Sequence, residues 1–209
     1  MKNFKTLFSI FLLSVITFGV KSQDTLTFKM HSKTTSKLIS DMVVPSTAIE
    51  DMELSLLLFN RINRYRIESG LEAIKIDTSI YKAAKHHSMY MASNVESLSH
   101  RESEEQFATP PKRMSHFLNR NVIGIENVLM KTVSNPATKK EILIEYMFLQ
   151  WKNSLGHNKN MLCQNISIGA VSVVKVKISY DVKSTRPNGE VKTINVPNTL
   201  IYATFNACK

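Results

Sequence analysis

The feature that most constrains the fold is a change in the spacing of apolar residues along the chain. As far as residue 151, apolar residues recur mostly at the three- and four-residue spacing of amphipathic helices. Over residues 174–181, apolar and polar residues alternate one by one, as in a strand with one buried face. The pattern therefore predicts an α+β protein in which most helices precede a pair of antiparallel strands.

Two helices are predicted early in the chain. The segment Thr47–Glu50 fits a capping box for the first helix, and Gly70 is suited to end it in a left-handed conformation. Asp77 can cap the second helix. In that helix His87 lies on the apolar stripe and is predicted to be a core residue, whereas His86 is predicted to be solvated.

Two further helices are predicted before the strands. Residues 112–118 form a short helix after a pair of prolines, and residues 138–151 form a longer helix that runs into the only tryptophan. The longer helix is expected to stop at Ser154–Gly156, which places His157 at the first position after the helix end. A histidine there can bind a metal or transfer a proton, although a capping or solvated role is the commoner alternative.

The end of the chain is predicted to form strands. Pro187-Asn188-Gly189 is a hairpin signal, Pro197-Asn198 a second turn signal, and residues 200–205 a final strand. Residues 122–128 also read as a buried strand, interrupted by Glu126 and Asn127. A carboxylate in such a run must meet a cation, a donor or a metal, so Glu126 is either a site residue or part of a buried structural hydrogen bond.

Residues 1–22 have the character of a secretory signal peptide, with two early lysines and a short apolar run. The run is too short for a comfortable membrane span, although an uncleaved anchor is the alternative. Residues 23–48 are expected to be a loosely ordered leader, and residues 49–209 the domain. The protein is therefore expected to be secreted or periplasmic, with no transmembrane segment once the signal peptide is removed.

The chain carries a net charge of +10, and removing the signal peptide with its three lysines and no acid leaves +7. The lysines are dispersed and no arginine-rich run or stacking aromatic pattern is present, which argues against a specific nucleic-acid partner. The only cysteines are Cys163 and Cys208. In an exported chain an even pair favours a disulfide, with two free thiols as the alternative.

Six segments, in order, resemble the CAP superfamily, which contains cysteine-rich secretory proteins, venom allergens and plant pathogenesis-related proteins. They are similar to the motifs "LVNEERAKAGL", an alanine-rich second helix, "SH", "TPFDR", "GENI" and "WMNSPGHRANIL" of its bacterial secreted, SCP-like branch. In this chain they are residues 58–71, 83–92, 99–100, 109–113, 125–128 and 151–162.

The resemblance implies a three-layer α-β-α sandwich with a small antiparallel sheet and a central cavity. In that family the cavity carries histidines and glutamates, and several members bind a divalent metal, often zinc. The resemblance assigns His100, Glu126 and His157 to this set, with Asn127 and Ser154 as neighbours in the cleft. Ser154 stands where the family's second glutamate would lie, which weakens the expectation of full metal affinity.

Two histidines and one glutamate form a ligand set that zinc accepts. We expect a non-catalytic binding module whose cleft can hold zinc or another divalent metal, with a lipid or cell-envelope component as partner. The alternatives are a metal-dependent hydrolase of the peptidase type, in which Glu126 would be the catalytic residue, and a purely structural extracellular scaffold. No His-Glu-x-x-His or Gly-x-Ser-x-Gly motif is present to support a hydrolase.

Overall fold

The structure is a computed structural model that describes residues 48–93, 98–133, 135, 137–185 and 189–209. The predicted signal peptide, and all of the predicted leader except Ala48, lie outside the described residues. The elements in chain order are β1 (Ile49–Glu50), α2 (Met52–Glu68), β2 (Lys75–Ile76), α3 (Thr78–Ser93), the 3₁₀ turn η1 (Glu105–Phe107), α4 (Pro110–Leu118), β3 (Gly124–Val133), α5 (Lys140–Lys152), α6 (Leu155–Met161), β4 (Ile168–Thr185) and β5 (Val191–Cys208).

The described strands form one sheet in the order β1-β4-β5-β3, with β2 pairing in parallel to the start of β4. The other pairings are antiparallel, and β4 and β5 pair along their full length from Ile168↔Cys208 to Thr185↔Val191. The strand β3 pairs with the last part of β5 and leaves its other side open to the loops and to α6. This open edge positions the candidate site.

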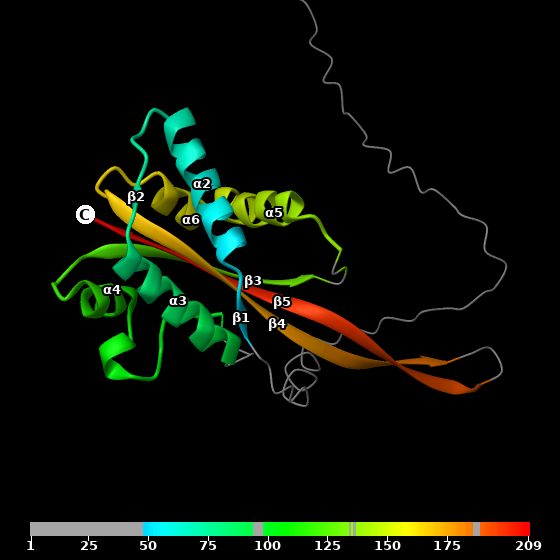
Figure 1. Cartoon of the computed structure of the whole chain (residues 1–209). Coiled ribbons are helices and arrows are strands. Elements are labelled where there is room, and N and C mark those ends of the chain that lie inside the picture. The colour runs from blue at the N-terminus through cyan, green and yellow to red at the C-terminus, as the bar shows by residue number, and fades with distance from the viewer. Residues whose placement is uncertain (1–47, 94–97, 134, 136, 186–188) are drawn as a thin grey trace, which may run out of the picture.

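Helices cover both faces of the sheet, so the molecule has three layers (Figure 1). The main core lies under α2, α5 and α6 and contains Trp151, Phe148 and Phe205. Two smaller cores lie on the opposite face, under α3 and α4. Because successive strand residues point to opposite faces, Phe205 joins the first core and Tyr202 one of the others. The predicted α+β class and α-β-α sandwich are confirmed.

The first helix begins later than the capping box predicted. Ile49 and Glu50 form β1, which pairs with β4, and Asp51 caps α2 by accepting a hydrogen bond from the Leu54 amide at 2.9 Å. Thr47 lies outside the described residues. An aspartate caps a helix as well as a threonine does, and pairing to the sheet decided between the two. The predicted cap of the second helix is confirmed, because Asp77 accepts from the Ser79 and Ile80 amides.

Helix α5 stops within two residues of the predicted stop at Ser154–Gly156, but the expectation that His157 follows a helix end is wrong. The chain leaves α5 at Lys152 and enters a second helix, α6, with Ser154 at the N-cap position. His157 is therefore the third residue of α6 and does not follow a helix end. The break between the two helices is short, and the change of direction lets both helices pack on the same side of the sheet.

The predicted turn at Pro197-Asn198 is also wrong, because both residues belong to the continuous strand β5. Pairing of β5 with β3 covers only Thr199–Cys208, so the part of β5 before Thr199 has β4 as its one neighbouring strand. A proline is tolerated where one side of a strand is unpaired. The predicted hairpin lies where the structure turns, and its Gly189 has a φ of +83°, while Pro187 and Asn188 lie outside the described residues. Figure 1 shows the β4–β5 hairpin projecting beyond the rest of the sheet.

The predicted disulfide is absent, because Cys163 and Cys208 are both free thiols. Cys163 packs against the core under α2 and α5, whereas Cys208 belongs to the core under α3 and α4. The sheet separates the two side chains, which a count of cysteines does not reveal. None of the described helices is long and apolar enough to cross a membrane.

Candidate functional site

Glu126 is buried on β3 and is held by an arginine that the sequence reasoning did not select. Its two carboxylate oxygens accept hydrogen bonds from the Arg113 guanidinium at 2.8 and 2.7 Å. Arg113 comes from α4, is fully buried, and also donates to the carbonyl oxygens of Phe107 and His100. Helix α4 thus supplies the cation that a carboxylate in an apolar strand requires.

A second carboxylate, Glu102, lies on the other side of the same arginine. It accepts from His86 Nε2 at 2.9 Å and from His87 Nδ1 at 2.7 Å, and lies 3.4 Å from Arg113. Burial raises the pKa of Glu102, but the hydrogen bonds from the two histidines and the charge of Arg113 outweigh burial and lower that pKa to about 2. Glu102 is therefore ionised at neutral pH.

His87 connects the two carboxylates from the middle of α3. It is fully buried, its Nδ1 faces Glu102, and its Nε2 lies 2.7 Å from the Ser99 carbonyl and 3.6 Å from Glu126. Both ring nitrogens of His87 therefore lie within hydrogen-bond distance of a polar partner. The prediction that His87 is a satisfied core histidine is confirmed. We call Glu102, Glu126, Arg113 and His87 the carboxylate network.

His86 was predicted to be solvated, and this prediction is only partly right. Its side chain is 31% exposed, but its Nε2 is bonded to Glu102 and its ring lies over Phe107, with ring centres 4.1 Å apart. The sequence places His86 correctly beside the buried stripe of α3. The contact with Glu102 comes from a loop 16 residues further along the chain, and helix periodicity does not predict it.

His100 is the most accessible member of the predicted set. Its side chain is 49% exposed, and its Nδ1 lies 2.9 Å from Glu126 Oε1. The carboxylate therefore fixes a proton on Nδ1, and Nε2 has no hydrogen bond to a described residue. The structure brings His100 and Glu126 together as predicted.

His157 approaches the same place from α6 but does not contact Glu126. Asn127 donates to the His157 carbonyl oxygen at 3.0 Å, and Asn160 donates to the Glu126 carbonyl oxygen and to the Asn127 side chain. Burial and then the nearby charge of His100 lower the pKa of His157, so its imidazole is neutral at pH 7. We call His100, Glu126 and His157 the histidine site.

The alternation of β3 explains this arrangement. The side chain of Glu126 meets α4 on one face of the sheet, whereas that of Asn127 meets α6 on the other. His100 and His157 therefore approach the open edge of β3 from opposite faces. Ser154, the other predicted neighbour, occupies the N-cap position of α6 and makes no side-chain capping bond. It supplies no acid there.

The residues present do not fit a metal held by all three side chains. Both oxygens of Glu126 are bonded to a guanidinium, which already supplies the positive charge that a divalent cation would bring. Within the described ranges, no three His, Cys, Asp or Glu side chains are grouped so that they could hold a metal ion. A metal would have to displace Arg113 or bind through the histidines alone.

Three functional neighbours were not predicted from the sequence: Arg113, Glu102 and His86. Arg113 stood in a segment that already resembled a family motif, so its position after the two prolines was an available signal. Glu102 lay in a charged loop, Arg101–Gln106, that reads as solvated. No signal in the sequence shows that this loop folds back under α3, because the contact joins residues about fifteen positions apart without a periodic pattern.

Two of three comparisons relate the chain to known proteins. The family model CAP, the cysteine-rich secretory protein family, matches residues 59–181, which is more than half of the chain. No curated protein was found to match. An outer surface protein from Borrelia burgdorferi is similar in structure, with a TM-score of 0.48 and 14% identity, over 78% of this chain and 99% of that one. An extracellular protein with an SCP domain from Bacillus anthracis str. Ames has a TM-score of 0.49 and 18% identity, over 75% of this chain and 40% of that one.

Proposed function

We propose that this chain, which belongs to the CAP family, the cysteine-rich secretory protein family, is a secreted, non-catalytic binding module. Its ligand would meet the histidine site at the open edge of β3. The sequence of residues 1–22 supports export, and the resemblance to the secreted branch of the family supports a lipid or cell-envelope component as partner.

The observation that carries the proposal is the pair of hydrogen bonds from Arg113 to Glu126. A general base must be accessible to the attacking water. The side chain of Glu126 is only 1% exposed and is held in a buried ion pair with Arg113, so it offers almost no surface to water, and Ser154 supplies no second acid. The exposed imidazole of His100 and the half-buried imidazole of His157 remain, and both can form hydrogen bonds with a polar ligand.

Retention on isolated cell envelopes and on phospholipid vesicles tests the binding role. The wild-type protein is expected to be retained, and the double variant His100→Ala/His157→Ala is expected to lose most of that retention. His116→Ala is the matched control, because His116 is an exposed histidine on α4 that contacts no member of the histidine site. Equal retention of the double variant would show that the histidine site is not the binding site.

Hydrolysis of casein and of a peptide library, with and without added zinc, tests the alternative function. We expect no turnover above the background of the buffer. Turnover that disappears in Glu126→Gln but persists in His116→Ala would instead establish a hydrolase. Calorimetric titration with zinc checks the predicted metal separately, and tight binding lost in the double histidine variant would show that the histidines suffice as ligands.

A further inference from the structure

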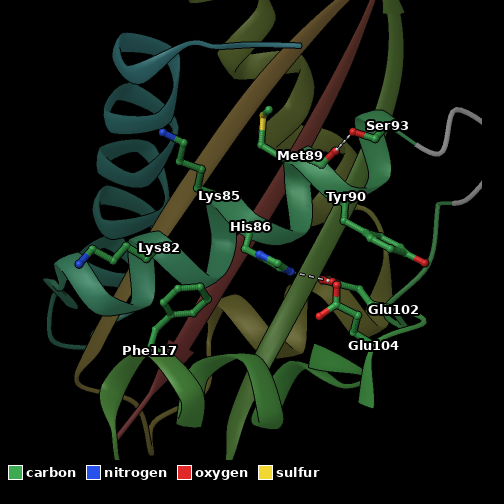
Figure 2. A pocket seen from close by; sticks show the side chains of 9 residues that line it. All are labelled: Lys82, Lys85, His86, Met89, Tyr90, Ser93, Glu102, Glu104 and Phe117. Carbon is green, nitrogen blue, oxygen red and sulfur yellow. Dashed lines mark hydrogen bonds and ion pairs between the residues drawn. The ribbon is translucent and has the colours of Figure 1, made fainter. Parts of the chain in front are cut away.

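A second concave region lies outside the histidine site, beside α3. It is a pocket of about 460 Å³ between α3, the loop that carries Glu102 and Glu104, and Phe117 of α4 (Figure 2). Neither His100, Glu126 nor His157 lines it. Its volume falls within the range of small-molecule sites, roughly 300–1,000 Å³. We call it the α3 pocket.

One side of the α3 pocket is formed by the imidazole of His86, which its neighbours hold in place. His86 is held by its Nε2 to Glu102, whose side chain is 1% exposed, and its ring lies against Phe107. Glu102 is in turn fixed by His87 and Arg113. The carboxylate network therefore holds His86 in one orientation, and Figure 2 shows its ring directed toward Glu102 across the pocket.

The charges of the pocket are separated to its two sides. Figure 2 shows Lys82 and Lys85 on one side of His86, with Glu102 and Glu104 on the other. Lys85 is bonded to Glu50 at 2.5 Å, but Lys82 makes no ion pair with a described residue. Glu104 accepts a hydrogen bond only from the neutral Gln106 among the described side chains. One cation and one anion thus remain uncompensated at opposite ends.

Apolar side chains also line the pocket. Phe117 and Met89 line the pocket, and the ring of Phe117 stacks with that of Phe107 behind it. A molecule that carries only a negative charge would face Glu104, and one that carries only a positive charge would face Lys82. A molecule with both charges and an apolar side chain complements the two charges and the apolar lining together.

We propose that the α3 pocket binds small zwitterionic ligands with an apolar side chain, of the chemical class of hydrophobic amino acids and short unblocked peptides. The ligand carboxylate lies toward Lys82, the ammonium group toward Glu104, and the side chain against Phe117 and Met89. The inference does not depend on the function of the histidine site, since the two sites share no lining residue.

Binding of three related probes tests the proposal. They are the dipeptide leucyl-leucine, its N-acetyl form without the ammonium group, and its C-terminal amide without the carboxylate. Calorimetry gives their affinities, and NMR shifts of His86 and of the Phe117 ring report the location. Leucyl-leucine is expected to bind about two- to fivefold more tightly than either blocked form, as a single partly exposed ion pair would give.

Single variants assign each end of the ligand. Lys82→Ala is expected to abolish the difference between leucyl-leucine and its amide, and Glu104→Gln the difference between leucyl-leucine and its N-acetyl form. Lys75→Ala and Glu141→Gln remove matched exposed charges elsewhere and are expected to change neither difference. The proposal is overturned if the three probes bind equally, if none binds at millimolar concentration, or if the shifts occur away from the pocket.

Discussion

Replacement of Arg113 by methionine tests the carboxylate network most directly. The side chain is fully buried and donates to two backbone carbonyls as well as to Glu126. Loss of the cation leaves a buried charge uncompensated, which costs about 3–5 kcal/mol. The two carbonyls lose their donor at about 1–3 kcal/mol each, but neighbouring terms are not additive. We therefore expect the free energy of unfolding to fall by about 4–6 kcal/mol.

Urea unfolding at pH 7 measures this loss, and the fluorescence of Trp151 reports it because that residue is the only tryptophan and is fully buried. Since domains are stable by only about 5–15 kcal/mol, the single variant will be close to its unfolding threshold. Arg113→Met/Glu126→Gln removes both charges and is expected to be more stable than Arg113→Met alone. Lys112→Met, at the neighbouring exposed position of α4, serves as the control.

The reasoning would be refuted by a loss below about 1 kcal/mol in Arg113→Met, because a cation that compensates a buried carboxylate cannot be removed so cheaply. It would also be refuted if the double variant were destabilised by the sum of the two single changes. Additivity would mean that Arg113 and Glu126 do not interact.

Three further predictions concern stability and thiol chemistry. The pKa of Glu102 is about 2 in the folded protein, below its ordinary value of 4.5. Its contribution to stability is therefore present above pH 4.5 and is lost as the pH falls toward 2. Urea unfolding at a series of pH values measures this dependence, and Glu102→Gln should flatten it. In a thiol-reagent assay Cys163 should react before Cys208, because burial raises the pKa of the Cys208 thiol. A reductant should leave the midpoint of unfolding unchanged, because both cysteines are free thiols. A midpoint that shifts with reductant would show that the disulfide forms after all. Gly124→Ala should cost about 1–3 kcal/mol because a Cβ would lie 2.8 Å from the Ala207 carbonyl oxygen, whereas Gly156→Ala, which meets nothing within 4 Å, should be neutral or stabilising by thermal unfolding.

Local patterns were enough to predict most of the elements. The stripe on α3 placed His87 in the core, Asp77 capped its helix, and the alternation over residues 174–181 indicated a strand. The predictions failed where two local signals competed. Ser154 can end one helix or cap the next, and Pro197 can turn the chain or lie in a strand with one unpaired side, and neighbouring elements decided each case.

The candidate site was also predicted in part. The pairing of His100 with Glu126 was predicted through the family resemblance, and the structure brings these two side chains into contact. The compensating cation was not predicted, because Arg113 reaches Glu126 from another element and only packing brings the two together. The same holds for the loop that carries Glu102 beneath α3.

The sequence by itself determined that the chain is an α+β domain of the CAP family, because hydrophobic spacing and ordered motifs are properties of neighbouring residues. Only the tertiary structure decided what balances the charge of Glu126 and on which face of β3 each histidine lies. It also separated Cys163 from Cys208 across the sheet. These outcomes depend on contacts between residues far apart in the chain. The free-energy cost of burying a charge or a polar group is offset by the partner that packing brings close.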